Sequence, residues 1–165
     1  MNILIIFLIH WYSSLFFQTV FLHRYSSHQM FTMSRFWEKV FFGFTFITQG
    51  SSFLNPRAYA ILHRLHHKYS DTEKDPHSPE FSKNIIMLNL NTIKHYESIR
   101  RNKKDYSKYD QNVPRWLWLE KFSDHWITRV SFMVTYTLIY VAYTTSTWQY
   151  MLLPIHFVMG PLHGS

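Results

Sequence analysis

The stretch LHRLHHKYSDTEKDPHSP, residues 62–79, places three histidines within five residues and a fourth further along. His63, His66 and His67 are three and four residues apart, and such positions share one face of an α-helix. Three imidazoles on one face can converge on a metal ion, and neutral imidazole suits iron, copper, nickel and zinc. The spacing therefore predicts a helix that carries part of a metal site. The alternative is a basic surface helix whose solvated face includes Arg64.

A second histidine pair, His23 and His28, lies upstream in HRYSSH. A spacing of five turns two side chains about 140° apart on an ideal α-helix. The pair therefore either lies where a helix ends or binds two different ions, and a metal-free histidine pair at a membrane interface is the alternative. Together the two clusters hold more imidazoles than one tetrahedral zinc ion uses, so two metal ions are the simpler inference.

Three further side chains follow the histidine-rich stretch: Asp71, Asp75 and His77. Carboxylates commonly orient the histidines that bind a metal, which predicts a supporting role for this group. The alternative is a turn-rich loop, because Asp-Pro and Ser-Pro both break helices. For the remaining histidines we expect helix packing (His10 and His156) or a surface position (His95 and His125), and His163 is left open.

The charged residues are confined to the middle of the chain. All 17 Lys and Arg lie between Arg24 and Arg129, and all 10 Asp and Glu lie between Glu38 and Asp124. The two ends are apolar, aromatic residues make up 19% of the chain, and Trp and Tyr that flank apolar runs suit a membrane interface. This layout predicts an integral, multi-pass membrane protein.

The apolar runs predict the membrane segments. Residues 3–22 and 130–148 are long enough to span as helices, and residues 150–165 begin a third apolar segment that is interrupted where the sequence stops. The polar groups of residues 10, 14 and 18 recur every four positions, so this stripe should face other helices. Basic residues accumulate on the cytoplasmic side, which places residues 23–129 and the metal site there.

Composition and motifs argue against a thiolate-ligated metal site and against a nucleic-acid-binding protein. The chain has no cysteine, so any metal must be held by nitrogen or oxygen. The net charge of +7 is compatible with nucleic-acid binding, but no nucleic-acid module is recognisable and the basic residues adjoin apolar segments. We therefore expect an all-α fold, namely one helical membrane domain over residues 1–165 with a cytoplasmic helical cap, and we expect membrane lipids rather than nucleic acid as partners.

The sequence as a whole resembles the membrane fatty acyl desaturases, and more narrowly the bacterial branch of the delta-9 acyl-CoA desaturases. The family's first box, H-x4-H, matches HRYSSH, its second box, H-x-x-H-H, matches HRLHH, and the Asp-Pro-His that follows matches residues 75–77. The combination of boxes, spacing and tail is specific, although either box alone is not.

The resemblance implies a helical membrane enzyme with a non-haem di-iron centre held mostly by histidines. Its ligands here would include His23, His28, His63, His66 and His67. Such an enzyme uses O2 and two electrons from an external donor, of the ferredoxin or b-type cytochrome class, to remove two hydrogens from a fatty acyl thioester. The acyl group would be attached to coenzyme A or to an acyl carrier, and the basic middle region could attract that anionic carrier.

One departure from the family pattern concerns the C-terminal part. In the family a third box, again H-x-x-H-H, and usually an Asn-x-x-x-His follow the final membrane helices, and residues 130–165 contain neither pattern. We therefore expect a C-terminally truncated desaturase that holds a partial site and does not turn over by itself. Three alternatives remain: a degenerate or non-catalytic metal-binding membrane protein, an alkane or lipid hydroxylase, and a basic protein that grips anionic lipid through residues 94–108.

Overall fold

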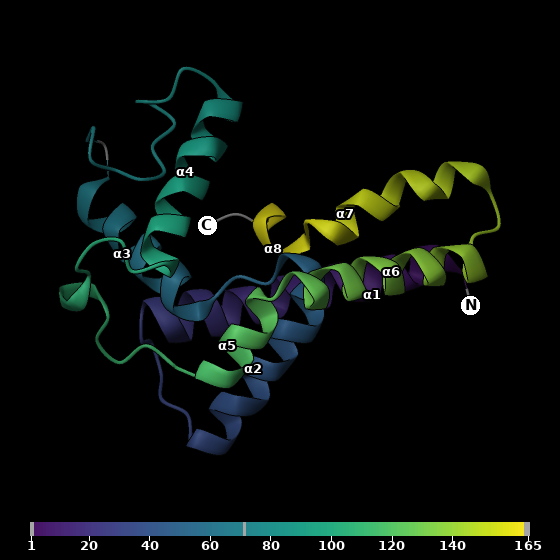
Figure 1. Cartoon of the computed structure of the whole chain (residues 1–165), viewed down its shortest axis with the longest axis horizontal. Coiled ribbons are helices and arrows are strands. Elements are labelled where there is room, and N and C mark those ends of the chain that lie inside the picture. Colours follow the sequence, from purple (N-terminus) through teal and green to yellow (C-terminus); the bar gives the residue numbers. More distant parts are fainter. Residues whose placement is uncertain (1, 71, 164–165) are drawn as a thin grey trace. The chain divides into compact units, whose positions relative to one another are not determined.

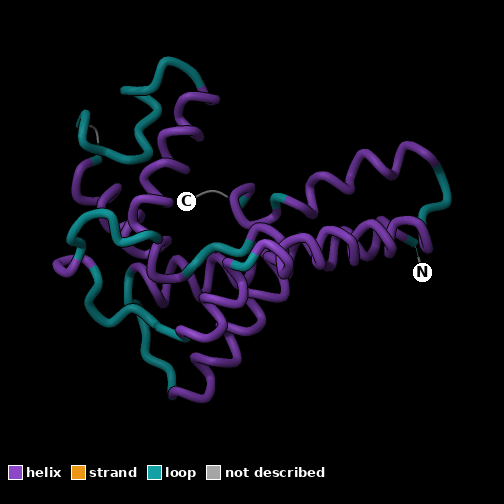
Figure 2. Tube along the Cα trace, in the orientation of Figure 1, coloured by secondary structure: helices purple, strands orange, loops and turns teal. Residues whose placement is uncertain are grey.

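The structure is a computed structural model that describes residues 2–70 and 72–163. Figure 2 shows helices joined by loops, and none of the described residues forms a strand. The prediction of an all-α fold is confirmed for this part of the chain. The chain divides into two compact units, one of residues 1–21, 33–54 and 116–165 and the other of residues 22–32 and 55–115, called here the first and second units.

The first unit contains helices from both the N-terminal and the C-terminal part of the chain (Figure 1). Its elements are α1 (Ile3–Phe17), α2 (Arg35–Gln49), the 3-10 turn η2 (Gly50–Ser52), α5 (Leu117–Asp124), α6 (Trp126–Tyr143), the 3-10 helix η4 (Thr147–Leu152), α7 (Leu153–Phe157) and α8 (Met159–Leu162). α1 packs against α2 and α6, and α6 packs against α5 and α7. Their shared core is aromatic: the ring of Phe42 lies 5.7 Å from Phe21 and 6.0 Å from Phe53.

A polar stripe on α1 faces the interior of the first unit, as the four-residue spacing predicts. Ser14 is fully buried and Gln18 is 3% exposed, and Gln49 of α2 donates to the Gln18 side-chain oxygen over 2.7 Å. His10 lies with its Nδ1 2.6 Å from Nδ1 of His156 on α7. A buried polar group is costly unless it is hydrogen-bonded, so these pairs fix the rotation of α1 about its axis.

The second unit is built on two packed helices, α3 (Pro56–Tyr69) and α4 (Ile85–Arg100), with the 3-10 turn η3 (Ser107–Tyr109) beside α3. Its small apolar core consists of Ala58 and Ile61 from α3 and Ile99 from α4. The Arg57 side chain anchors α3 to the loop after α4, because its Nε donates to Asp110 Oδ2 over 2.7 Å. The π-helix η1 (Gln18–Ser27) continues directly from α1 and contributes its last residues to this unit.

Among the described residues, one helix is long and apolar enough to cross a membrane, and it runs from Ile3 to Ser27. This helix contains the predicted span 3–22 and extends beyond it. The predicted span 130–148 falls on α6 and the residues after it, and the apolar segment from residue 150 folds into η4, α7 and α8. A second and third span stay predictions.

Candidate metal centre

The π-helix η1 explains how two histidines five residues apart come together. In a π-helix each N–H bonds to the carbonyl five residues earlier, so residues five apart lie about one turn from each other. The His28 N–H donates to the His23 carbonyl over 3.1 Å, which is such a bond. As a result, Nε2 of His23 and Nε2 of His28 lie 3.2 Å apart. The divergence of about 140° that an ideal α-helix would impose is removed by the wider turn.

Helix α3 supplies the other two imidazoles of the centre. The helix begins at a strong start signal, because the Asn55 side chain accepts from the Ala58 N–H over 3.1 Å and Pro56 occupies the first turn. His63 and His67 are four residues apart and therefore share a face. Their Nε2 atoms lie 3.0 Å apart.

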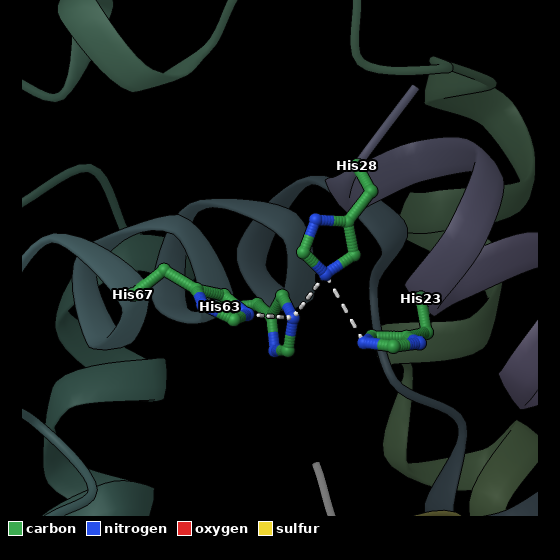
Figure 3. A group of neighbouring side chains, drawn as sticks. All are labelled: His23, His28, His63 and His67. Atoms are coloured by element: carbon green, nitrogen blue, oxygen red, sulfur yellow. Dashed lines mark hydrogen bonds between the residues drawn. The ribbon is translucent and has the colours of Figure 1, made fainter. Parts of the chain in front are cut away.

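Four imidazoles converge in the second unit, and Figure 3 shows their ring nitrogens pointing toward one another. His23 and His28 come from η1 and the residue after it, and His63 and His67 come from α3. The Nε2 atoms of His28 and His63 are 2.9 Å apart, and one nitrogen from each of the four rings lies within 4.8 Å of the others. The two histidine boxes, separated by more than thirty residues of sequence, thus form one cluster, called here the four-histidine cluster.

Hydrogen bonding alone does not satisfy this cluster. A neutral imidazole nitrogen carries either one hydrogen or one lone pair. The contacts run His23–His28–His63–His67, so the nitrogens of His28 and His63 each meet two neighbours. If all three contacts are hydrogen bonds, donors and acceptors must alternate along this row. One of the two middle nitrogens then shares its single hydrogen between two acceptors, and the other shares its single lone pair between two donors. This is a poor hydrogen-bonding arrangement.

A metal ion accounts for the same geometry. Four deprotonated nitrogens can all donate lone pairs to one cation, and adjacent nitrogen ligands lie about 3 to 3.4 Å apart when each is about 2.1 Å from the ion. The observed separations of 2.9, 3.0 and 3.2 Å are close to this range. An all-imidazole donor set without thiolate suits iron, copper, nickel or zinc. The residues present therefore fit a transition-metal ion.

The electrostatics of the cluster keep its buried member neutral. His63 is 6% exposed. Burial, followed by the neighbouring imidazoles of His23 and His67, lowers the pKa of His63 to about 3. Burial and then His23 also lower the pKa of His28. At neutral pH the imidazole of His63 thus keeps a lone pair available for a metal.

Arg64 holds the two elements of the centre together. Its guanidinium donates to four backbone carbonyls: Ser26 and Ser27 at the end of η1, each over 2.9 Å, and Tyr109 and Gln111 beyond α4, over 2.7 and 2.9 Å. A planar guanidinium with five N–H donors suits such a set, whereas an ammonium does not. The interpretation of Arg64 as part of a solvated face is wrong. No sequence signal marks this residue, because a tethering arginine and a solvated one look alike beside a histidine.

His66 lies outside the four-histidine cluster. Its Nδ1 is 2.9 Å from Oδ1 and 3.0 Å from Oδ2 of Asp75, whose side chain is 2% exposed. The same carboxylate accepts from the His77 N–H over 2.8 Å, and the His77 ring lies 5.9 Å from that of His66. Asp75 thus holds the ring of His66 and His77 lies beside it, and their role in orienting a metal ligand stays a prediction. Asp71 lies outside the described residues.

Of the other histidines, four have packing or capping contacts and His95 is exposed. His10 and His156 contact each other as expected of helix-packing residues, and His156 Nε2 also lies 3.0 Å from the Tyr140 hydroxyl. The His163 ring packs edge-on against Trp11 at 4.7 Å. His125 is exposed and caps α6, since its Nδ1 accepts from the Ile127 N–H over 3.3 Å, and His95 is exposed on α4.

Comparison with known proteins agrees with the site. The sequence model of the fatty acid desaturase family, described as "Fatty acid desaturase", matches residues 1–163. Among curated proteins, the chain is similar to the delta-9 desaturase-like 4 protein of Arabidopsis thaliana, with 28% identity over 124 residues. The match covers 72% of this chain and 37% of that relative, so the chain spans well under half the length of the relative. No solved structure matches the chain.

The match over residues 1–163 confirms the family that the two histidine boxes and the Asp-Pro-His tail predict, and the delta-9 type agrees with the similar plant protein. The bacterial branch and the truncation stay predictions. The family is membrane-associated, and the long apolar helix Ile3–Ser27 is consistent with that. The chain belongs to the fatty acid desaturase family.

Proposed function

We propose that this chain carries the histidine-ligated metal centre of an oxygen-dependent fatty acyl desaturase. The observation that carries the proposal is the convergence of four imidazoles from the two histidine boxes within 4.8 Å. Family membership supplies the reaction class, an oxidoreductase that acts on fatty acyl chains. The metal is proposed to be iron, which with O2 supplies an oxidant strong enough to break an unactivated C–H bond.

The residues of the centre have separate proposed roles. His23, His28, His63 and His67 would hold one ion through their Nε2 atoms. His66 would help to hold a second ion, because its Nδ1 is already bound to Asp75 and its Nε2 is left to donate a lone pair. Two irons per chain are therefore proposed, with the centre on the cytoplasmic side of a multi-pass helical bundle.

The proposed substrate is a long-chain fatty acyl thioester, on coenzyme A or an acyl carrier. Exposed basic residues around α4 and the following loop, Lys94, Lys103 and Lys104, offer positive charge for an anionic carrier. The two electrons would come from an external protein of the ferredoxin or b-type cytochrome class. These partners rest on the family and on charge.

The metal centre is tested by a Co2+ titration of the detergent-purified chain, followed by the visible absorption of the bound ion. We expect His63→Gln to weaken binding at the four-histidine cluster at least a hundredfold, because three imidazoles remain and the central one is lost. His95→Gln, at an exposed histidine outside the cluster, is the matched control and should change the affinity less than twofold. Equal affinities for both variants would contradict the assignment.

The same titration separates the two proposed ions. His66→Gln should leave the first Co2+ bound with an affinity within about twofold of the parent chain and remove only the weaker, second equivalent. A single equivalent in the parent chain would contradict the two-ion proposal and favour a non-catalytic metal-binding protein.

The reaction class is tested by product analysis. A longer form of the chain that also carries the third histidine box, loaded with iron in membranes and supplied with a C18 acyl-CoA, O2 and a reduced donor protein, is expected to yield an acyl chain with one new double bond. A hydroxylated chain would instead favour the lipid hydroxylase alternative. No product from that longer form, once it binds iron fully, would favour the non-catalytic alternative.

A further inference from the structure

A second candidate site lies in the first unit, where α5 meets the start of α6. An open pocket of about 380 Å³ is lined there by Trp118, Lys121, Phe122, His125, Ile127 and Thr128. None of these residues contributes to the four-histidine cluster. The pocket combines an apolar wall with a polar end, and each part indicates what the site binds.

The apolar wall is aromatic and exposed. The rings of Trp118 and Phe122 are stacked with their centroids 5.4 Å apart, and these side chains are 65% and 46% exposed. Ile127 is 52% exposed beside them. Further along α6 an exposed apolar row continues at Val130, Val134, Leu138 and Val141. A surface of this kind suits hydrocarbon rather than water, and Trp is typical of the level where a bilayer meets water.

The polar end carries positive charge that is not neutralised. Lys121 forms no ion pair with another described residue, whereas Asp124 is 3.3 Å from Arg129 and Glu120 is buried and accepts from the Trp116 N–H. His125 adds a donor: its Nδ1 accepts from the Ile127 N–H, so in the neutral ring the hydrogen is on Nε2. The pocket itself contains no carboxylate among the described residues that line it.

Two further groups at the polar end suit an anion. Thr128 lines the pocket, is 8% exposed, and its hydroxyl has no hydrogen-bond partner among the described residues. The pocket also lies at the first turn of α6, an 18-residue helix with no acidic residue in that turn. The N-terminus of a helix carries partial positive charge and free N–H groups, so it favours negative charge.

We propose that this pocket binds the headgroup phosphate of an anionic phospholipid, with the acyl chains along Trp118, Phe122 and the exposed row of α6. The cationic polar end favours an anionic group, and the adjoining exposed apolar face favours a ligand that also carries hydrocarbon chains. Free inorganic phosphate would meet only the polar end, and a second copy of the chain would have to supply a carboxylate there. This site does not depend on the metal centre.

The proposal is tested by native mass spectrometry of the detergent-purified chain titrated with phosphatidylglycerol or phosphatidylcholine. Phosphatidylglycerol is expected to bind at least fivefold more tightly than phosphatidylcholine, and millimolar inorganic phosphate should not displace it. Lys121→Gln should weaken phosphatidylglycerol binding about fivefold, as expected for one lysine at an anionic headgroup. Lys103→Gln removes the same charge from an exposed lysine of the second unit and is the matched control.

Thr128→Val, which keeps the shape of the side chain but removes the hydroxyl, gives an independent result. It should weaken phosphatidylglycerol binding three- to tenfold without lowering the melting temperature. Equal binding of the two lipids would overturn the proposal. So would equal effects of Lys121→Gln and Lys103→Gln, displacement of the lipid by inorganic phosphate, or a dimer that forms through this face without lipid.

Discussion

Gly50 ends helix α2 in a conformation that other residues rarely adopt. Its φ is +53°, in the left-handed region that favours glycine, and its N–H bonds back to the Phe46 carbonyl. A Cβ at this position would overlap the hydroxyl of Tyr136 on α6. By contrast, a Cβ added to Gly43, in the middle of the same helix, would meet no described atom within 4 Å. Glycine is therefore required at position 50 by backbone conformation and by the close approach of Tyr136, whereas position 43 has space for a side chain.

Replacing each glycine by alanine separates these purposes. Gly50→Ala should destabilise the protein by at least about 1 to 2 kcal/mol, from left-handed strain alone, with the overlap adding to it. Gly43→Ala is the matched control and should stabilise by about 0.5 to 1 kcal/mol, because alanine loses less entropy in a helix. Thermal melting in detergent measures both, and a Gly50→Ala protein as stable as the parent would contradict this packing of Tyr136 against α2.

The position of His66 shows where a prediction from sequence spacing fails. His63, His66 and His67 all qualify for one helical face, yet only His63 and His67 join the cluster. A carboxylate nine residues further along the chain, Asp75, holds the ring of His66 instead. Sequence spacing places a Cβ on a face, but the side-chain torsion is chosen by whichever partner is within reach.

At the level of elements, the metal centre depends on how the end of η1 meets α3. The π-helix brings His23 and His28 onto one side, and Arg64 joins η1 to α3 through backbone carbonyls. The widened turn of η1 carries His23, whereas Arg64 contributes no ligand. Both act by holding the imidazoles where their nitrogens converge.

Arg64→Lys tests this tether. An ammonium has three donors on a compact group and cannot reach all four carbonyls, so the end of η1 should loosen from α3. We expect metal affinity at the four-histidine cluster to fall about tenfold, in line with other residues that orient ligands. A Co2+ titration followed by visible absorption measures the affinity, with circular dichroism to check helix content.

Arg101→Lys is the matched control for the tether. Arg101 is exposed, and its Nε lies 3.0 Å from the Glu97 carboxylate at the end of the same helix. A lysine can keep that contact, and metal affinity should stay within about twofold. A comparable loss in both variants would show that the arginine-to-lysine change itself, rather than the tether, is responsible.

At the level of the whole molecule, the four-histidine cluster lies within the second unit and the pocket proposed to bind lipid lies within the first. The second unit has a small apolar core, so a bound ion should contribute much of its stability. A ligand that binds only the folded state at about a hundredfold above its Kd adds about 2.7 kcal/mol to the free energy of unfolding.

Metal removal should therefore lower the melting temperature of the protein by several degrees. Scanning fluorimetry with and without a chelator measures the shift, and readdition of Fe2+ under anaerobic conditions should restore it. The His63→Gln variant should show a much smaller shift on chelation or readdition of metal. A shift of the same size in that variant would place the stabilising ion elsewhere.

The sequence by itself determined the helical class, the family and the residue types of the candidate metal centre. These follow from local pattern: apolar runs predict helices, and closely spaced histidines with an Asp-Pro-His tail predict a metal site. Each signal depends only on residues that are neighbours along the chain, which is why it can be read without a structure.

The tertiary structure decided which histidines meet. The wider turn of the π-helix brings His23 next to His28, and the ring of His66 binds Asp75 instead of joining the cluster. The Arg64 guanidinium connects η1 to α3. These outcomes depend on contacts between residues far apart in the sequence. Such contacts form where they bury apolar surface and satisfy the hydrogen bonds of buried polar groups in the folded unit. The spacing of residues along the chain does not reveal them.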